Sequence, residues 1–250
     1  MKTRALLRKP GRNFADGITT SVLGKPDFIK ALEQHQAYCE ALSKCGLELT
    51  VMEADERFPD GCFVEDTAVI TKEVTIISRP GAASRLGEET VIMEMLSEHR
   101  LIKRIEYPGT LDGGDIMRMD NHFFIGRSKR TNKEGADQLA GILSDFGYPT
   151  SEIKVESVPH LKSGVTYIGN GNFISIEEFS DEFPAYNVIK VNKDEGYSSN
   201  CLLVNDILLI SKGFPESKRR ILELGYRIIE LEMSEFRKMD GALTCLSLLF

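Results

Sequence analysis

A thiol, an imidazole and several carboxylates in this sequence could together perform nucleophilic catalysis. Cys245 is the sixth residue from the C-terminus, in the apolar run LTCLSLLF that follows the turn signal MDG. A cysteine and a histidine can act as nucleophile and acid/base partner, and a carboxylate that orients the histidine completes the set. His160 is a candidate for the histidine, and the candidate acids are Asp60, Glu65, Asp66, Asp112 and Asp115. The alternative is that Cys245 is a small core residue and His160 a loop residue.

Two adjacent acids, Glu65 and Asp66, interrupt an apolar segment, FVEDTAVI. Neighbouring residues of a strand point to opposite faces, so we expect at least one of these carboxylates to point inward. A buried carboxylate is costly unless it is paired or hydrogen-bonded. A planar guanidinium ligand would suit two carboxylates, and a salt bridge to an internal arginine is the alternative. Asp60, Asp112 and Asp115 add further acids; for the last two, in LDGGD, a hydrogen-bonded turn is the alternative.

Segments of helical and strand character alternate along the chain and would position these side chains. Helices are predicted over 26–45, 84–98, 132–146 and 215–224, punctuated by Pro26, Asn132, Pro215 and following glycines. The predicted buried face of the first helix consists of Phe28, Ile29, Leu32, Cys39 and Leu42. Strands are predicted over 74–78, 122–126, 206–210 and 226–230.

A period is superimposed on this alternation. Five strand-like segments with polar ends begin at residues 63, 111, 160, 200 and 243, roughly 40–49 residues apart. Such self-similarity predicts repeated units of strands and one helix each. Five α/β units could close into a ring, with the polar strand ends meeting in a central well. No Gly/Ser linker or charge run divides the chain, so we predict a single domain over 1–250.

The composition limits the class of protein. The chain has 250 residues, of which 42% are hydrophobic and 28% charged, which is enough for a sizeable core. The net charge of -7 argues against nucleic acid as a partner. No apolar run is long enough for a signal segment or a membrane span. Five cysteines without a CxxC pair argue against a zinc or disulfide framework, and we expect a cytoplasmic protein with free thiols.

Taken together, the motifs resemble the dimethylarginine dimethylaminohydrolase family. The resemblance runs over essentially the whole chain, in order, through PDGCFVEDTAVI, RPGAASR, GTLDGGDIM, IGRSKRTNKEGA, HLKSG, NCLLVN and KMDGALTCLSLLF. It is strongest to the short bacterial members. The family belongs to a guanidine-modifying superfamily with arginine deiminase. The resemblance implies a pentein fold, an α/β propeller of five ββαβ-type units with pseudo-fivefold symmetry.

The resemblance also implies catalytic roles. Cys245 matches the nucleophile, His160 the general acid/base and Asp112 the carboxylate that supports the histidine, where close relatives can carry Glu. The implied reaction converts asymmetric dimethylarginine or monomethylarginine and water to citrulline and an amine. Cys245 would attack the guanidinium carbon, His160 would protonate the departing amine, and water would release citrulline from an S-alkylthiouronium. Several acids near the thiol should oppose its ionisation before the cationic substrate binds.

Further positions match substrate-binding residues of the family. Asp66 matches the main guanidinium-binding acid, with Glu65 and Asp60 in further pocket positions. Arg85 and Arg130 match the arginines that hold the substrate's α-carboxylate. The backbone carbonyls of Ile18 and Met239 fall where the α-ammonium is received. Ile18 replaces the usual Leu of a mobile lid, for which Gly17 would be a hinge.

Two other functions stay open at this point. An arginine deiminase or another guanidino or ureido hydrolase would share the chemistry, although arginine deiminases tend to carry an inserted helical domain. A pentein that only binds a ligand or protein partner would not need an intact Cys245 and His160. No cofactor and no metal are expected, and a zinc ion on these two residues would be expected to inhibit. Bacterial relatives suggest a homodimer.

Overall fold

The strands of the protein form five small sheets. In a computed structural model, which describes residues 2–250, they are β1 (Arg4–Arg8), β2 (Glu48–Met52), β3 (Ala68–Ile70), β4 (Val74–Ile77), β5 (Leu101–Arg104), β6 (Ile116–Met119), β7 (His122–Arg127), β8 (Thr150–Lys154), β9 (Val165–Gly169), β10 (Asn172–Ser175), β11 (Asn187–Lys190), β12 (Leu202–Val204), β13 (Ile207–Ser211), β14 (Arg227–Leu231) and β15 (Leu248–Leu249). The predicted strands 74–78, 122–126, 206–210 and 226–230 correspond to β4, β7, β13 and β14.

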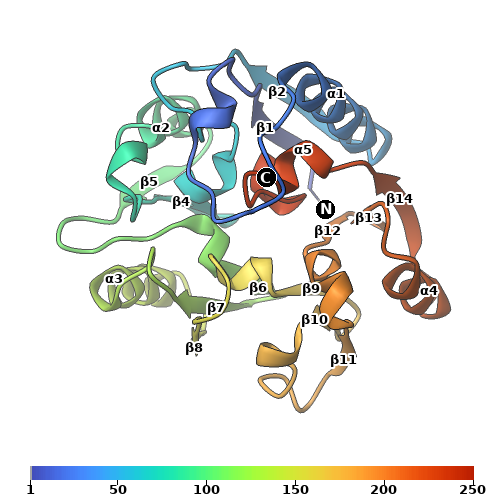
Figure 1. The fold of residues 1–250 in the computed structure, drawn as a ribbon. Helices are drawn as coiled ribbons and strands as arrows, with labels where there is room; N and C mark the ends of the chain where they lie inside the picture. Colours follow the sequence, from blue (N-terminus) through green and yellow to red (C-terminus); the bar gives the residue numbers. More distant parts are fainter. Residues whose placement is uncertain (1) are drawn as a thin grey trace.

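The five sheets repeat one topology around a central axis (Figure 1). Their strand orders are β15-β1-β2, β3-β4-β5, β6-β7-β8, β9-β10-β11 and β12-β13-β14. In each sheet the first pair is antiparallel and the second pair parallel. The first strands lie innermost, since β15 contacts β3, and β9 contacts both β6 and β12. The predicted five-unit pentein propeller is therefore confirmed.

The last strand closes the ring. β15 pairs with β1, through Ala5 opposite Leu249 and Leu6 opposite Leu248. The first sheet thus combines both ends of the chain, and both termini lie near the centre of the propeller in Figure 1. Because Cys245 precedes β15 by only a few residues, this closure carries the thiol to the central axis.

Helices cover the outside of four sheets and connect their parallel strands. They are α1 (Phe28–Lys44), α2 (Glu89–Ser97), α3 (Lys133–Asp145) and α4 (Pro215–Glu223), with a short α5 (Ser234–Arg237) near the axis (Figure 1). The four predicted helices are confirmed, as is the Asn132 cap, whose side chain accepts from the Gly135 N–H. The α1 stripe was only partly right: Ile29 is 61% exposed, and the buried face centres on Ala31, Tyr38 and Leu42.

The fourth sheet departs from the predicted pattern of one helix per unit. Between β10 and β11 the chain forms only a 3₁₀ turn, Glu177–Phe179. The connection is short, and Pro184 cannot continue a helix. Phe183, in this connection, stacks on Phe173 with ring centroids 4.1 Å apart.

Five 3₁₀ turns precede the innermost strands: directly before β3 and β6, with one intervening residue before β9 and β15, and with two before β12, where the turn lies ahead of the predicted polar segment at residue 200. They are η2 (Val64–Thr67), η4 (Gly113–Asp115), η5 (Leu161–Ser163), η7 (Lys193–Ser199) and η8 (Thr244–Leu246). The strand reading of FVED is thus corrected: Glu65 and Asp66 lie in a turn, so strand alternation does not set their directions. Contacts of η2 with η8 and η4, and of η5 with η4 and η7, gather the turns at the axis, as the predicted central well requires.

The described residues 2–250 contain no helix long and apolar enough to cross a membrane. All five cysteines are free thiols, as predicted. Cys39, Cys45, Cys62 and Cys201 are buried, whereas Cys245 is only partly buried. Exposure therefore distinguishes Cys245 from the other thiols.

Candidate active site

A small cavity of about 70 Å³ at the axis collects most of the predicted site residues. Its lining includes Ile18, Asp60, Asp66, Arg85, Arg130, His160, Met239 and Cys245. Asp112 and Glu65 are the two predicted residues outside this lining. Ile18 and Thr20, in the loop before α1, form part of the wall of this cavity.

Cys245 lies in the turn η8, whose backbone is held in place by hydrogen bonds. Its N–H donates to the Ala242 carbonyl at 3.2 Å. The hydroxyl of Tyr38, a fully buried residue of α1, donates to the Leu243 carbonyl at 2.8 Å and lies 2.7 Å from the Ser247 hydroxyl. Burial, followed by the charges of Glu65 and Asp66, raises the pKa of Cys245 to about 12. The resting site therefore holds a protonated thiol.

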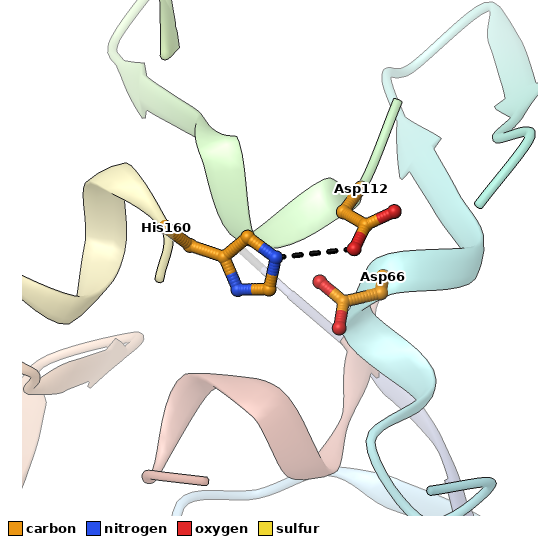
Figure 2. Close-up of side chains that lie close together, drawn as sticks. All are labelled: Asp66, Asp112 and His160. Carbon is orange, nitrogen blue, oxygen red and sulfur yellow. Dashed lines mark hydrogen bonds and ion pairs between the residues drawn. The ribbon is translucent and has the colours of Figure 1, made fainter. Parts of the chain in front are cut away.

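His160 is held against a buried carboxylate. Its Nε2 lies 3.1 Å from Oδ2 of Asp112, which is fully buried (Figure 2). Burial alone would lower the pKa of the imidazole, but Asp66, Asp115 and Asp112 together raise it to about 9. His160 is consequently an imidazolium at neutral pH and has a proton to donate.

Two glycines of LDGGD make room for this arrangement. A Cβ atom on Gly114 would lie 2.8 Å from Nδ1 of His160 and 2.9 Å from Oδ1 of Asp66. A Cβ atom on Gly113 would lie 2.0 Å from the Glu65 carbonyl oxygen. The turn η4 can approach its neighbours only because it carries no side chains there, a role that the sequence pattern alone did not indicate.

Asp115 is a site residue whose role sequence reasoning did not assign. Its carboxylate is fully buried and accepts hydrogen bonds from the hydroxyls of Ser128 and Thr131, each at 2.7 Å, and from the Leu161 N–H at 3.0 Å. It thereby joins the turns beside His160 and adds negative charge to the imidazolium's surroundings. Ser128 and Thr131 in the SKRTN motif were the available sign in the sequence that a buried carboxylate would need hydroxyl donors.

Asp66 combines the two alternatives that the sequence left open. Its Oδ2 lies 2.5 Å from Nη1 of Arg85, and its Oδ1 accepts the Gly114 N–H at 2.8 Å. Burial opposes its charge, yet His160 and Arg85 lower the pKa of Asp66 to about 2. An internal salt bridge is thus present, and the ionised carboxylate still lines the cavity.

The two predicted clamp arginines differ in their surroundings. Arg85 is buried, and its guanidinium bonds to Asp66, to Glu88 and to the Phe63 carbonyl. The Arg130 side chain is 23% exposed, and its nearest acid is Asp112, 3.9 Å from Nη1. Arg130 is therefore the freer of the two to bind an incoming carboxylate.

Glu65 lies behind the turn that carries Cys245 and does not line the cavity. Its Oε2 accepts the Thr244 hydroxyl at 2.7 Å, and its Oε1 pairs with Nζ of Lys162 at 2.5 Å. Asn200 bridges the same region, accepting the Thr244 N–H at 3.1 Å and donating to the Lys162 carbonyl at 2.9 Å. These residues connect the turn of Cys245 with the turn after His160.

The loop with Ile18 covers the cavity. The Ile18 N–H donates to both carboxylate oxygens of Asp60, at 3.0 and 3.1 Å, and the Thr20 N–H donates to Asp240 at 2.5 Å. Gly17 has an ordinary φ of -67°. A Cβ atom there would lie 2.5 Å from Oδ1 of Asp60, so close approach is what requires this glycine.

Asp66, Asp112 and His160 lie close enough to share a metal ion, with their ligand atoms within 4.8 Å of one another (Figure 2). Each is already engaged with a charged neighbour: Asp66 with Arg85, and Asp112 with Arg130 and the His160 imidazole. A cation there would face two guanidinium groups and compete with a proton for the imidazole. The arrangement favours proton transfer over metal binding.

This fold and site define a pentein-type, guanidine-modifying cysteine hydrolase: a thiol, an imidazolium and ionised carboxylates meet at the axis of a five-unit propeller. The family model described as N,N dimethylarginine dimethylhydrolase, eukaryotic, matches residues 27–178. The N(G),N(G)-dimethylarginine dimethylaminohydrolase of Pseudomonas aeruginosa is 45% identical over 249 residues, 98% of each chain. The Streptomyces coelicolor enzyme of the same name is 34% identical over 98% of this chain and 95% of its own. The chain belongs to the dimethylarginine dimethylaminohydrolase family.

Solved structures agree with this assignment. The P. aeruginosa enzyme, as a Cys-to-Ser mutant complexed with citrulline, matches with a TM-score of 0.98 and 44% identity over all of both chains. A His-to-Gly mutant adduct with S-methyl-L-thiocitrulline matches equally well. The N-terminal domain of the arginine dihydrolase ArgZ shares the fold, with a TM-score of 0.89 at 18% identity over 100% of this chain and 97% of that one.

Proposed function

We propose that Cys245 and His160 carry the hydrolysis of asymmetric dimethylarginine and monomethylarginine. The observation that carries this proposal is their shared cavity, in which a neutral thiol and an imidazolium face the ionised Asp66. A substrate guanidinium beside Asp66 would bring a positive charge next to Cys245. That charge would lower the pKa of the thiol, so that binding of the substrate favours the thiolate.

The proposed first half-reaction is an attack of the Cys245 sulfur on the guanidinium carbon. The thiol proton passes to solvent water as the C–S bond forms, since His160 is already protonated. The tetrahedral adduct breaks its bond to the methylated nitrogen, and His160 gives that nitrogen a proton, so that dimethylamine or methylamine departs as a neutral amine. An S-alkylthiouronium is left on Cys245, and His160 is neutral.

The second half-reaction uses the neutral imidazole as a base. His160 takes a proton from water, whose oxygen attacks the thiouronium carbon. Collapse of this adduct breaks the C–S bond and releases citrulline, and the proton of the added hydroxyl returns through solvent to the sulfur, which restores the neutral thiol. Asp112 supports both steps, because its buried carboxylate fixes the imidazole and stabilises its charged form.

The amino-acid end of the substrate is assigned to the other side of the cavity. We infer that Arg130 binds the α-carboxylate, with Arg85 chiefly holding Asp66 in place. The carbonyls of Ile18 and Met239 would receive the α-ammonium; among residues 2–250 neither carbonyl accepts a recorded hydrogen bond. Their availability supports this role.

The remaining expectations are proposals of the same kind. The free thiols support a reducing, cytoplasmic location, and the closure of the ring by β15 supports one domain over 1–250. A homodimer stays a prediction from the resemblance, to be measured by light scattering.

Citrulline formation tests the proposed function. Asymmetric dimethylarginine, monomethylarginine, symmetric dimethylarginine, arginine and agmatine are compared side by side. The proposal predicts that the first two are turned over fastest. If arginine were the best substrate, the protein would act as a deiminase, and the assignment of substrate would be wrong.

A further inference from the structure

A second and larger cavity lies on the other side of the turns that carry the active site. Its volume is about 760 Å³, and it shares no lining residue with the candidate active site. The innermost strands β3, β6, β9, β12 and β15 supply much of its wall, and Glu65, Lys162 and Thr244 lie at its inner end. The cavity thus occupies the axis on the opposite face of the propeller, separated from Cys245 by the Glu65–Lys162 pair.

Besides the exposed Lys72, three cations in this cavity have no carboxylate partner among residues 2–250. Nζ of Lys2 donates to the Leu249 carbonyl at 2.8 Å, and Nε of Arg100 to the Thr71 carbonyl at 2.9 Å. The third is Arg118, whose Nε donates to the Asp120 carbonyl at 2.7 Å. None of these side chains makes an ion pair to an acid in this part of the chain.

The acids that face the cavity do not neutralise the cations. Glu65 is paired with Lys162, and the Asp120 carboxylate accepts only a long bond, 3.5 Å, from the Tyr167 hydroxyl. The Phe250 main-chain oxygen accepts the N–H groups of Thr3 and Arg4. In a chain of net charge -7, a site with unpaired positive charge is the exception.

The two arginines are held in place by aromatic rings. The Arg100 guanidinium lies 5.2 Å from the ring centroid of Phe250, and that of Arg118 lies 5.2 Å from Phe123 and 5.3 Å from Tyr148. Stacking fixes the planes of the guanidinium groups while their terminal N–H groups stay available. Burial, followed by the charges of Arg118 and Arg100, lowers the pKa of Lys2 to about 8, as mutual repulsion requires.

We propose that this cavity binds a small, multiply charged oxyanion of the phosphate class, with Lys2, Arg100 and Arg118 as its charged ligands. An anion among them would replace the repulsion by charge-assisted hydrogen bonds. The cavity has the volume of ordinary small-molecule sites, and its wall is largely apolar beyond the cations. It has room for a phosphate group alone or for one carried by a nucleotide.

Titration calorimetry at pH 7 with inorganic pyrophosphate tests the proposal on the full-length protein. Wild type should bind one pyrophosphate. Lys2→Gln and Arg118→Gln should each weaken binding about 10-fold or more, the effect of removing one charged hydrogen bond. The matched control is Arg227→Gln, which removes the same charge from an exposed pair with Asp206. The Lys2 side chain is only partly buried, so its variant keeps the test valid if Arg118→Gln fails to fold.

A second set of titrations separates this cavity from the active site, where Arg130 could also attract an anion. Saturating citrulline should leave pyrophosphate binding unchanged. Competition with citrulline, equal weakening by Arg227→Gln, or no binding by wild type would overturn the proposal. A last titration uses ADP. If ADP binds more tightly than pyrophosphate, the ligand of the cavity is a nucleotide, and if ADP binds equally or more weakly, the ligand is a free oxyanion.

Discussion

Arg130 and Arg85 both match arginines that hold the substrate's α-carboxylate in the family. Their substitution by alanine should nevertheless have different consequences. Arg130→Ala removes a partly exposed side chain whose nearest acid is 3.9 Å away, so the fold should lose little. A charged hydrogen bond to the substrate's carboxylate is worth roughly 1.5–3 kcal/mol, which predicts a rise in KM for dimethylarginine of about 10- to 150-fold.

Arg85→Ala instead leaves two buried carboxylates without their partner. Arg85 lies 2.5 Å from Asp66 and 2.7 Å from Glu88, and all three side chains are about 95% buried or more. Breaking a buried ion pair costs about 3–5 kcal/mol. In a chain of this length such a loss lowers Tm on the order of 10 °C.

The assay measures Tm and citrulline formation for both variants, with dimethylarginine and with agmatine, which lacks the carboxylate. Arg127→Ala is the matched control: its side chain is 29% exposed and pairs with Glu152 on the surface. Arg130→Ala should weaken dimethylarginine turnover selectively and leave the slow agmatine turnover unchanged. If agmatine turnover falls in parallel, Arg130 is structural, and the clamp lies elsewhere.

Three further predictions concern the acid/base pair. Asp112→Asn should lower kcat at least 10-fold and move the alkaline limb of the pH profile to lower pH, because one of the carboxylates that raise the pKa of the imidazole is lost; the surface variant Asp137→Asn should do neither. Gly114→Ala should abolish most activity, since a Cβ atom would meet Nδ1 of His160 at 2.8 Å, whereas Gly141→Ala, in open space within α3, should be active and no less stable. Wild-type kcat/KM should fall above about pH 9, as the imidazolium loses its proton, and a constant rate up to pH 10 would argue against His160 as the acid.

Helices and the fivefold period were accessible from the sequence because both depend on local patterning. Asn132 and Pro215 begin α3 and α4 at the predicted places, whereas α1 begins at Phe28 with Asp27 as its N-cap and Pro26 just outside. Ile29 was misplaced because the α1 stripe includes Gln34 and His35, polar residues that apolar periodicity does not detect. The helix expected in the fourth unit is absent, because the connection between β10 and β11 is short and contains Pro184.

Site geometry was less accessible, since it depends on turns between distant segments. Both Glu65 and Asp66 were predicted to face the substrate. Asp66 does line the cavity, but Glu65 points to the opposite side of η2. Gly114 and Asp115 act through the shape and hydrogen bonds of the assembled turns, which no local pattern reports.

The central claim is that Cys245 forms a covalent bond with the guanidinium carbon. Mass spectrometry of protein that is acid-quenched during turnover of dimethylarginine measures this directly. We expect the mass of a thiouronium adduct on the C-terminal peptide with Cys245, absent in Cys245→Ser, which should fold normally and be inactive. An adduct on the buried Cys201 or another thiol, or undiminished turnover by Cys245→Ser, would contradict the account.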